Sequence, residues 1–114
     1  MVARAYVPDL GDLIWLGAEA PSAREPRPRG AALVLTPRNY NAKTALALAC
    51  PVARQNKGYP FEVVLPPGGI VTGVVLADRI RSIDWRARGA EFAARAPEEV
   101  VTEALERIRA LLRL

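Results

Sequence analysis

The side chains best suited to chemistry in this sequence are cations grouped around one predicted hairpin. Two precede it and four follow it: Arg54 and Lys57, then Arg79, Arg81, Arg86 and Arg88. Guanidinium groups donate several hydrogen bonds to phosphate or carboxylate oxygens, and ammonium groups bind the same oxygens as compact charges. The grouping indicates a binding surface for an anionic partner.

The distribution of charge supports such a surface. The formal net charge is +4, but residues 24–88 carry eleven Lys and Arg against four Asp and Glu, a local charge of +7. The two ends of the chain are slightly acidic. A basic middle favours a polyanionic partner such as a nucleic acid. A soluble, Arg-rich surface without a specific partner would give the same numbers.

The residues that are missing limit the chemistry. The sequence has no histidine and one cysteine, Cys50. Without imidazole it lacks the side chain that most often exchanges protons near neutral pH, and one cysteine excludes both an internal disulfide and a Cys-based zinc cluster. A reaction would have to use Arg, Lys, carboxylates, hydroxyls or backbone groups, and we expect neither a metal nor a cofactor.

Short apolar segments between Pro and Gly residues predict the strands that position these side chains. They lie at residues 13–16, 31–35, 45–52, 61–65 and 70–76. The last two flank Pro66-Pro67-Gly68-Gly69 and are expected to form an antiparallel pair. Segment 45–52 has a helix-like composition, but its length and Pro51 favour a strand. Residues 38–44 are expected to form a turn.

The remaining segments complete one domain spanning residues 1–114. Residues 17–30 contain three prolines and predict a loop, which could close over a substrate or simply connect two strands. Residues 97–113 predict an amphipathic helix, since Val101, Leu105, Ile108 and Leu112 share one face. The expected fold is a small, mainly β, antiparallel barrel-like domain with a C-terminal α-helix. No apolar run could span a membrane and no signal peptide is recognised, so a cytoplasmic location is expected.

Four segments resemble one protein family in the same order. They are YVPDLGDLIWL, ALVLTPRNYN, CPV followed by KGYPFEVVL, and GVVLADRIRSIDWRARGA, which together span residues 6–90. On these segments the chain resembles the MazF toxins of the MazF/PemK class. The resemblance implies an SH3-like barrel that forms a homodimer and cleaves single-stranded RNA, usually mRNA, without a metal. It also implies a MazE-like antitoxin whose acidic C-terminal segment covers the RNA-binding surface.

The resemblance also suggests which residues carry the reaction. Arg29 is the candidate for stabilising phosphoryl charge, Glu25 for a base, and Thr36 for a hydroxyl contribution. Thr36 could equally bond within the turn that ends its strand. The RNA contacts are expected on three segments, from Asn41 and Lys43, from Arg54, Gln55 and Lys57, and from Arg79, Arg81 and Arg86.

The sequence departs from the family pattern at two catalytic positions. The family arginine aligns with Gly30, one residue after Arg29, and the family threonine aligns with Ala53, whose side chain transfers no proton. An alternative is therefore a catalytically weakened module that still binds RNA or antitoxin. A gyrase-inhibiting toxin on the same type of fold is a further alternative, ranked last because KGYPFEV and RNYN match the ribonuclease branch better.

Overall fold

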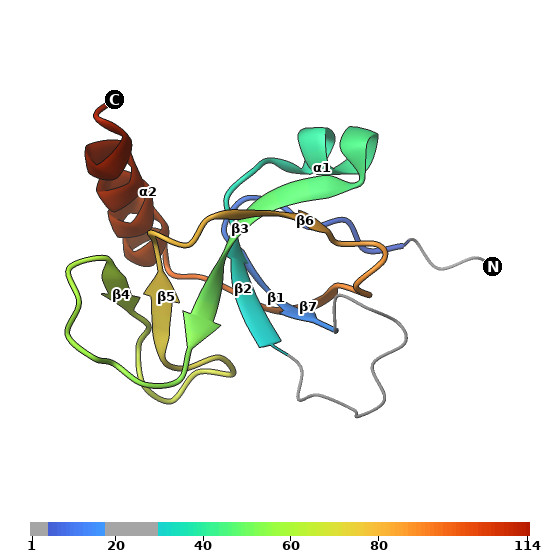
Figure 1. Ribbon diagram of the computed structural model, residues 1–114. Coiled ribbons are helices and arrows are strands. Elements are labelled where there is room, and N and C mark those ends of the chain that lie inside the picture. The colour runs from blue at the N-terminus through green and yellow to red at the C-terminus, as the bar shows by residue number, and fades with distance from the viewer. Residues whose placement is uncertain (1–4, 18–29) are drawn as a thin grey trace, which may run out of the picture.

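The computed structural model describes residues 5–17 and 30–114, and these contain seven strands and two helices (Figure 1). The strands are β1 Asp12–Leu16, β2 Gly30–Val34, β3 Leu46–Ala53, β4 Glu62–Val64, β5 Val74–Leu76, β6 Arg81–Asp84 and β7 Glu91–Arg95. The helices are α1 Arg38–Thr44 and α2 Glu98–Leu112. No helix in the described ranges is long and apolar enough to cross a membrane.

Every strand pair is antiparallel, and β3 pairs with three other strands. The sheet runs in the order β4-β5-β3-β2-β1-β7, and β6 also pairs with β3. One edge of β3 pairs with β2, while the other edge pairs first with β6 and then with β5. The predicted, mainly antiparallel β-domain with a C-terminal helix is confirmed.

Over the described residues, the sheet does not close into the expected barrel. The two ends of the strand order, β4 and β7, do not pair with each other in the described part of the chain. Helix α2 packs beside β4 instead, so a helix flanks the sheet on the β4 side (Figure 1). The sheet is therefore coiled but open.

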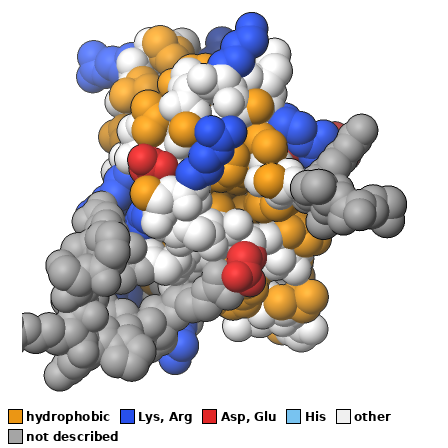
Figure 2. Space-filling view, turned by 90° about the vertical axis from the view of Figure 1, so that its right-hand side faces the viewer, with side chains coloured by type: hydrophobic (Ala, Val, Ile, Leu, Met, Phe, Trp, Pro, Cys, Tyr) orange, Lys and Arg blue, Asp and Glu red, His pale blue; other side chains and the backbone are white. Residues whose placement is uncertain are grey.

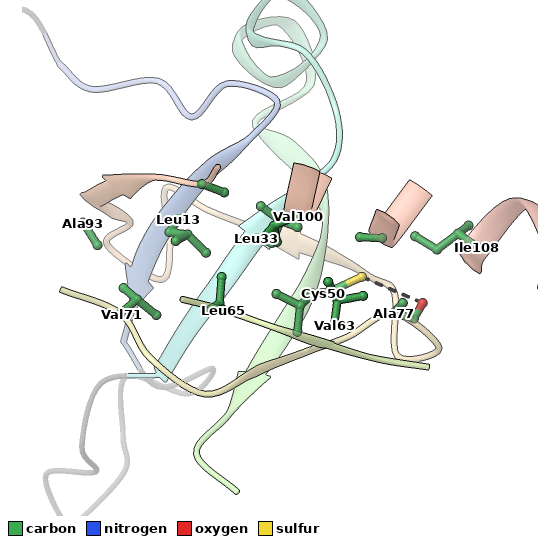
Figure 3. Packing of buried hydrophobic residues seen from close by; sticks show 13 residues of the cluster. Leu13, Leu33, Cys50, Val63, Leu65, Val71, Ala77, Ala93, Val100 and Ile108 are labelled. Carbon is green, nitrogen blue, oxygen red and sulfur yellow. Dashed lines mark hydrogen bonds between the residues drawn. The ribbon is translucent and has the colours of Figure 1, made fainter. Parts of the chain in front are cut away.

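Alternate residues of the central strands fill two apolar clusters on opposite faces of the sheet. Leu13, Leu33 and Cys50 point into the first, which is covered by β4, β5 and the buried side of α2 (Figure 3). Ile14 and Val34 point into the second, which Ile83 and Trp85 close. Burial on both faces explains why these strands appear in the sequence as nearly continuous apolar runs.

A buried carboxylate ties the N-terminal segment to the sheet. Asp12 is 4% exposed and accepts a hydrogen bond from Arg95 Nη1 at 2.9 Å. Its other oxygen accepts bonds from the Tyr6 hydroxyl at 2.6 Å and the Asp9 amide at 3.0 Å. Burial and the bond to Asp12 raise the pKa of Tyr6 above its ordinary value, so Tyr6 acts here as a hydrogen-bond donor.

Three local predictions need correction. Residues 38–44 form helix α1 and not a turn, because the buried Asn41 side chain bonds this segment to the Pro8 and Thr36 carbonyl oxygens. The strand predicted at 70–76 covers only Val74–Leu76, since Gly68 and Gly73 adopt positive φ and keep the intervening residues in a loop. Strands β6 and β7 were not predicted because only Ile83 and Ala93 in them are buried.

Gly73 brings β5 against the end of β3. Its φ is +116°, and a Cβ atom at this position would overlap the Ala53 carbonyl oxygen. We expect Gly73→Ala to lower the free energy of unfolding by about 2–4 kcal/mol, because it adds a backbone clash to an unfavourable φ. Urea unfolding would measure this. Gly68→Ala is the matched control, since Gly68 also has positive φ but open space around it. Equal losses in the two variants would contradict the close contact.

Candidate functional site

The segment between β3 and β4 carries the polar side chains that were predicted to bind RNA. Residues 54–59, here called the basic loop, begin where β3 ends at Ala53. Arg54, Gln55 and Lys57 are all exposed on it, and Tyr59 is 62% exposed. The structure therefore brings these three predicted residues together on one surface segment with an accessible aromatic ring.

A single carboxylate of β4 fixes the conformation of this loop. Glu62 Oε1 accepts hydrogen bonds from the backbone amides of Lys57 and Tyr59, each at 3.0 Å. Glu62 Oε2 lies 3.3 Å from the Lys57 amide, and the Glu62 amide in turn donates to the Tyr59 carbonyl oxygen. The loop thus has a defined shape although it contains neither helix nor strand.

Three adjoining hollows run from the basic loop across the sheet. The first, of about 260 Å³, is lined by Gln55, Lys57, Tyr59 and Arg79 together with Glu62 and Asp78. The second, of about 270 Å³, shares Arg79 with the first and adds Arg81 and Arg88 above an apolar floor. The third, of about 410 Å³, shares Gly30 and Val52 with the second and includes Arg54 and Thr72. The three hollows share lining residues, and together they are here called the basic channel.

The cations of the basic channel come from distant parts of the sequence. Arg54 and Lys57 follow β3, whereas Arg79 lies between β5 and β6, Arg81 begins β6, and Arg88 follows β6. The pairing of β3 with both β5 and β6 places them side by side. Arg88 is oriented by a hydrogen bond from its Nε to the Gly17 carbonyl oxygen at 3.0 Å. Closely spaced cations over an apolar floor suit a chain of phosphates carrying flat bases.

The coloured part of the face in Figure 2 carries more basic than acidic side chains. On the face in Figure 2, Lys and Arg side chains are spread among exposed hydrophobic ones, and acidic side chains are sparse. Such a surface attracts anions over a distance and offers apolar contacts once they arrive.

Three predicted RNA-binding residues lie outside the basic channel, two of them on the surface. Lys43 is exposed on α1, and Arg86 lies over the ring of Trp85, 5.0 Å from the ring centroid. Neither residue lines the three hollows. Of the eight predicted RNA contacts, five line the channel, and these are Arg54, Gln55, Lys57, Arg79 and Arg81.

Asn41 and Thr36 have internal partners. Asn41 is fully buried, and its Nδ2 donates to the carbonyl oxygens of Pro8 and Thr36, both at 2.8 Å. The Thr36 hydroxyl donates to Asn41 Oδ1 at 2.7 Å and accepts from the Leu48 amide at 3.1 Å. Direct contact of Asn41 with RNA is incompatible with this burial, and the Thr36 hydroxyl is occupied within the strand end.

The remaining groups are two catalytic candidates and the single cysteine. Glu25 and Arg29 lie outside the described residues. Burial raises the pKa of the Cys50 thiol to about 12, and its Sγ points at the Ala77 carbonyl oxygen at 4.0 Å (Figure 3). Cys50 therefore remains a thiol at neutral pH. In the described ranges no three His, Cys, Asp or Glu side chains gather as a metal site.

The predicted site residues did not include Arg88, Thr72 or Glu62, which line the channel. Thr72 brings a hydroxyl to the same hollow as Arg54, but it lies in a segment predicted as strand. Glu62 is the one acid in the apolar run 61–65, and no role was predicted for it. That position was itself a usable signal, because a buried carboxylate is almost always paired with donors.

Comparisons with known proteins agree with one another. The family model described as "PemK-like, MazF-like toxin of type II toxin-antitoxin system" matches residues 9–112. "Endoribonuclease toxin MazF" of Escherichia coli strain K12 is 50% identical over 101 residues, covering 88% of this chain and 89% of that protein. "Endoribonuclease PemK" of Escherichia coli is 36% identical over 104 residues, covering 87% and 78%.

Solved structures extend the agreement to the fold. A MazE-MazF crystal structure from Deinococcus radiodurans (Form-II) matches with a TM-score of 0.86 and 48% identity, covering 96% of this chain and 99% of that chain. A mycobacterial endoribonuclease in complex with its cognate antitoxin matches with a TM-score of 0.76 at 18% identity, over 94% and 96% of the two chains. This second match supports the fold alone.

The buried position of Asn41 predicts a loss of stability on its removal. We expect Asn41→Ala to lower the free energy of unfolding by about 2–3 kcal/mol, because two buried carbonyl oxygens and the Thr36 hydroxyl lose a partner. Asn39→Ala on the same helix is the control, since Asn39 is exposed and its Oδ1 accepts only from the neighbouring Tyr40 amide. Thermal or urea unfolding would measure both. A stable Asn41→Ala protein with weakened RNA binding would contradict the internal role.

Proposed function

Because this chain belongs to the PemK-like, MazF-like toxin family of type II toxin–antitoxin systems, we propose that it is an endoribonuclease toxin cleaving single-stranded mRNA without a metal ion. The observation that carries the proposal is the basic channel, in which Arg54, Lys57, Arg79, Arg81 and Arg88 line three adjoining hollows. A channel of this kind follows a flexible phosphate backbone better than it fits a rigid duplex.

In the proposed binding mode, different channel residues contact different parts of the RNA. Arginine and lysine side chains hold phosphates, and the Gln55 amide reads the edge of an unpaired base. Tyr59 offers its exposed ring for stacking. Lys43 and Arg86 lie outside the channel and would contact only a longer RNA that extends beyond it.

The proposed chemistry is attack of an RNA 2′-hydroxyl on the adjacent phosphorus. A base removes the hydroxyl proton, an acid protonates the leaving 5′-oxygen, and cations stabilise the negative charge on the phosphorane. Arg54 lines the third hollow, and Arg29 directly precedes Gly30, which lines it too. Guanidinium groups suit this charge stabilisation, while their high pKa makes them poor bases. Glu25 is the proposed base, and Thr72 adds a hydroxyl to the hollow.

The proposed partners follow from the family. The Deinococcus match is a MazE-MazF structure, so we propose that an antitoxin with an acidic C-terminal segment neutralises this chain by covering the basic channel. We also propose a homodimer acting in the cytoplasm, where mRNA is available. The matched relatives named here are endoribonucleases, which leaves the gyrase alternative without support from them.

A catalytically weakened RNA-binding module remains the second candidate, and Ala53 favours it. The side chain at this position has no hydroxyl, and Gly73 packs against its backbone. The two candidates share the channel and differ only in the products that they yield.

Cleavage of a long single-stranded RNA in excess EDTA tests the proposal. We expect discrete cuts at a recurring short sequence, mapped by primer extension. We expect Arg54→Ala to lower kcat/KM at least about tenfold, since a hydrogen bond to a charged group contributes about 1.5–3 kcal/mol. Arg29→Ala is expected to abolish cleavage.

Arg113→Ala is the matched control, because it removes the same charge at the far end of α2. It should cleave like the unmodified protein. Intact RNA with measurable binding would replace the nuclease proposal by the RNA-binding module, and restored cleavage in Ala53→Thr would then identify the missing group. Cleavage that stops with EDTA would contradict metal independence.

A further inference from the structure

We propose that Glu62 is a positioning residue that holds the basic loop in its RNA-binding conformation before RNA arrives. Glu62 is acidic and so is not expected to attract RNA directly. Its role follows from where its two carboxylate oxygens point. The inference rests on the proposed function, since it concerns how the same channel achieves its affinity.

Glu62 is placed to act on the loop and on little else. It is 8% exposed, and both of its oxygens face backbone amides of Lys57 and Tyr59 at 3.0–3.3 Å. In the described part of the chain no Lys or Arg nitrogen lies within ion-pair distance of it. The charge of Glu62 is therefore stabilised by amides, and the cations of Lys57 and Arg79 in the same hollow stay available for phosphate.

A second side chain completes the arrangement. Asn56 Oδ1 accepts a hydrogen bond from the Gly58 amide at 2.9 Å, and Gly58 has a φ of +78° that allows the loop to turn there. Three consecutive amides, those of residues 57–59, are thus held by side-chain oxygens of the protein. These three amides are already bonded within the protein, which leaves recognition to the side chains of Gln55, Lys57 and Tyr59.

An ordered loop lowers the cost of binding. A loop that becomes ordered only when RNA binds loses conformational entropy on binding, and this loss weakens the affinity. A loop that is already ordered in the free protein loses less. Removing the carboxylate would free the loop and also leave two amides without their acceptor. Affinity should fall although the protein has become more positive.

Loop order and net charge predict opposite changes in RNA affinity when Glu62 is removed, and this makes the inference testable. Charge alone predicts that loss of an acid from a basic channel tightens RNA binding. Asp78 lines the same hollow as Glu62 but is exposed, so Asp78→Asn removes the same charge without touching the loop amides. The inference predicts weaker RNA binding on loss of Glu62 and no weakening on loss of the Asp78 charge.

The experiment measures binding of fluorescent, random-sequence 2′-O-methyl oligoribonucleotides, which lack the attacking hydroxyl and stay intact. We expect Glu62→Ala to raise Kd about tenfold and Asp78→Asn to leave Kd equal or lower. Glu62→Gln keeps an oxygen for the two shorter bonds and should stay within about threefold of the unmodified protein. With cleavable RNA at saturation, Glu62→Ala should keep kcat within about twofold while KM rises.

Amide hydrogen exchange on the same proteins gives a readout independent of RNA. The Lys57 and Tyr59 amides should exchange faster in Glu62→Ala than in the unmodified protein, while core amides of β3 keep their protection. If Glu62→Ala fails to fold, Asn56→Ala decides instead. Weaker RNA binding together with faster exchange of the loop amides is the expected result, and unchanged values of both overturn the inference.

The possible failures are distinguishable. An unmodified protein that binds RNA, together with a folded Glu62→Ala protein that binds as tightly or more tightly, overturns the inference and leaves the proposed function intact. Unchanged exchange of the two loop amides in Glu62→Ala overturns it as well. An unmodified protein that binds no RNA contradicts the proposed function itself, and the role of Glu62 in RNA binding falls with it.

Discussion

Strand β3 is the constraint on which the rest of the structure depends. Its first half pairs with β6 and its second half with β5, while its other edge pairs with β2. A single strand thus joins both parts of the sheet, and the basic loop begins where it ends. The contact between Gly73 and the Ala53 carbonyl fixes this end against β5. The cations that follow β3 and those near β6 are therefore brought together by backbone pairing.

Buried polar groups determine the conformation of segments that the apolar core does not fix. Asn41 holds α1 against the N-terminal segment, Asp12 joins that segment to β7, and Glu62 orders the basic loop. Each of these side chains is at most 8% exposed and bonded to at least two groups. Hydrogen bonds of this kind add modest net stability but penalise alternative conformations strongly, because a buried polar group without a partner is costly.

Strands with buried apolar runs could be predicted from the sequence, whereas elements that depend on buried polar contacts or bury little largely could not. Leu13–Leu16 and Ala31–Leu35 are buried on both faces, so their apolar runs identify β1 and β2. Strands β6 and β7 each bury little, so no pattern identifies them. Helix α1 consists of turn-forming residues, and its helical state depends on Asn41 bonding to residues distant in the sequence, such as Pro8. The cations of the channel could be named individually, but the shared role of Arg79 in two hollows required the strand pairing.

The central claim is that the basic channel is the RNA-binding surface. Titration of isotope-labelled protein with 2′-O-methyl single-stranded oligoribonucleotides, followed by backbone amide shifts, tests it most directly. The account predicts that the largest shifts occur in residues 54–59 and near Thr72, Arg79 and Arg81, with α2 residues 98–112 little affected. Shifts concentrated on α2 or on the exposed side of α1, with the basic loop unchanged, would contradict it.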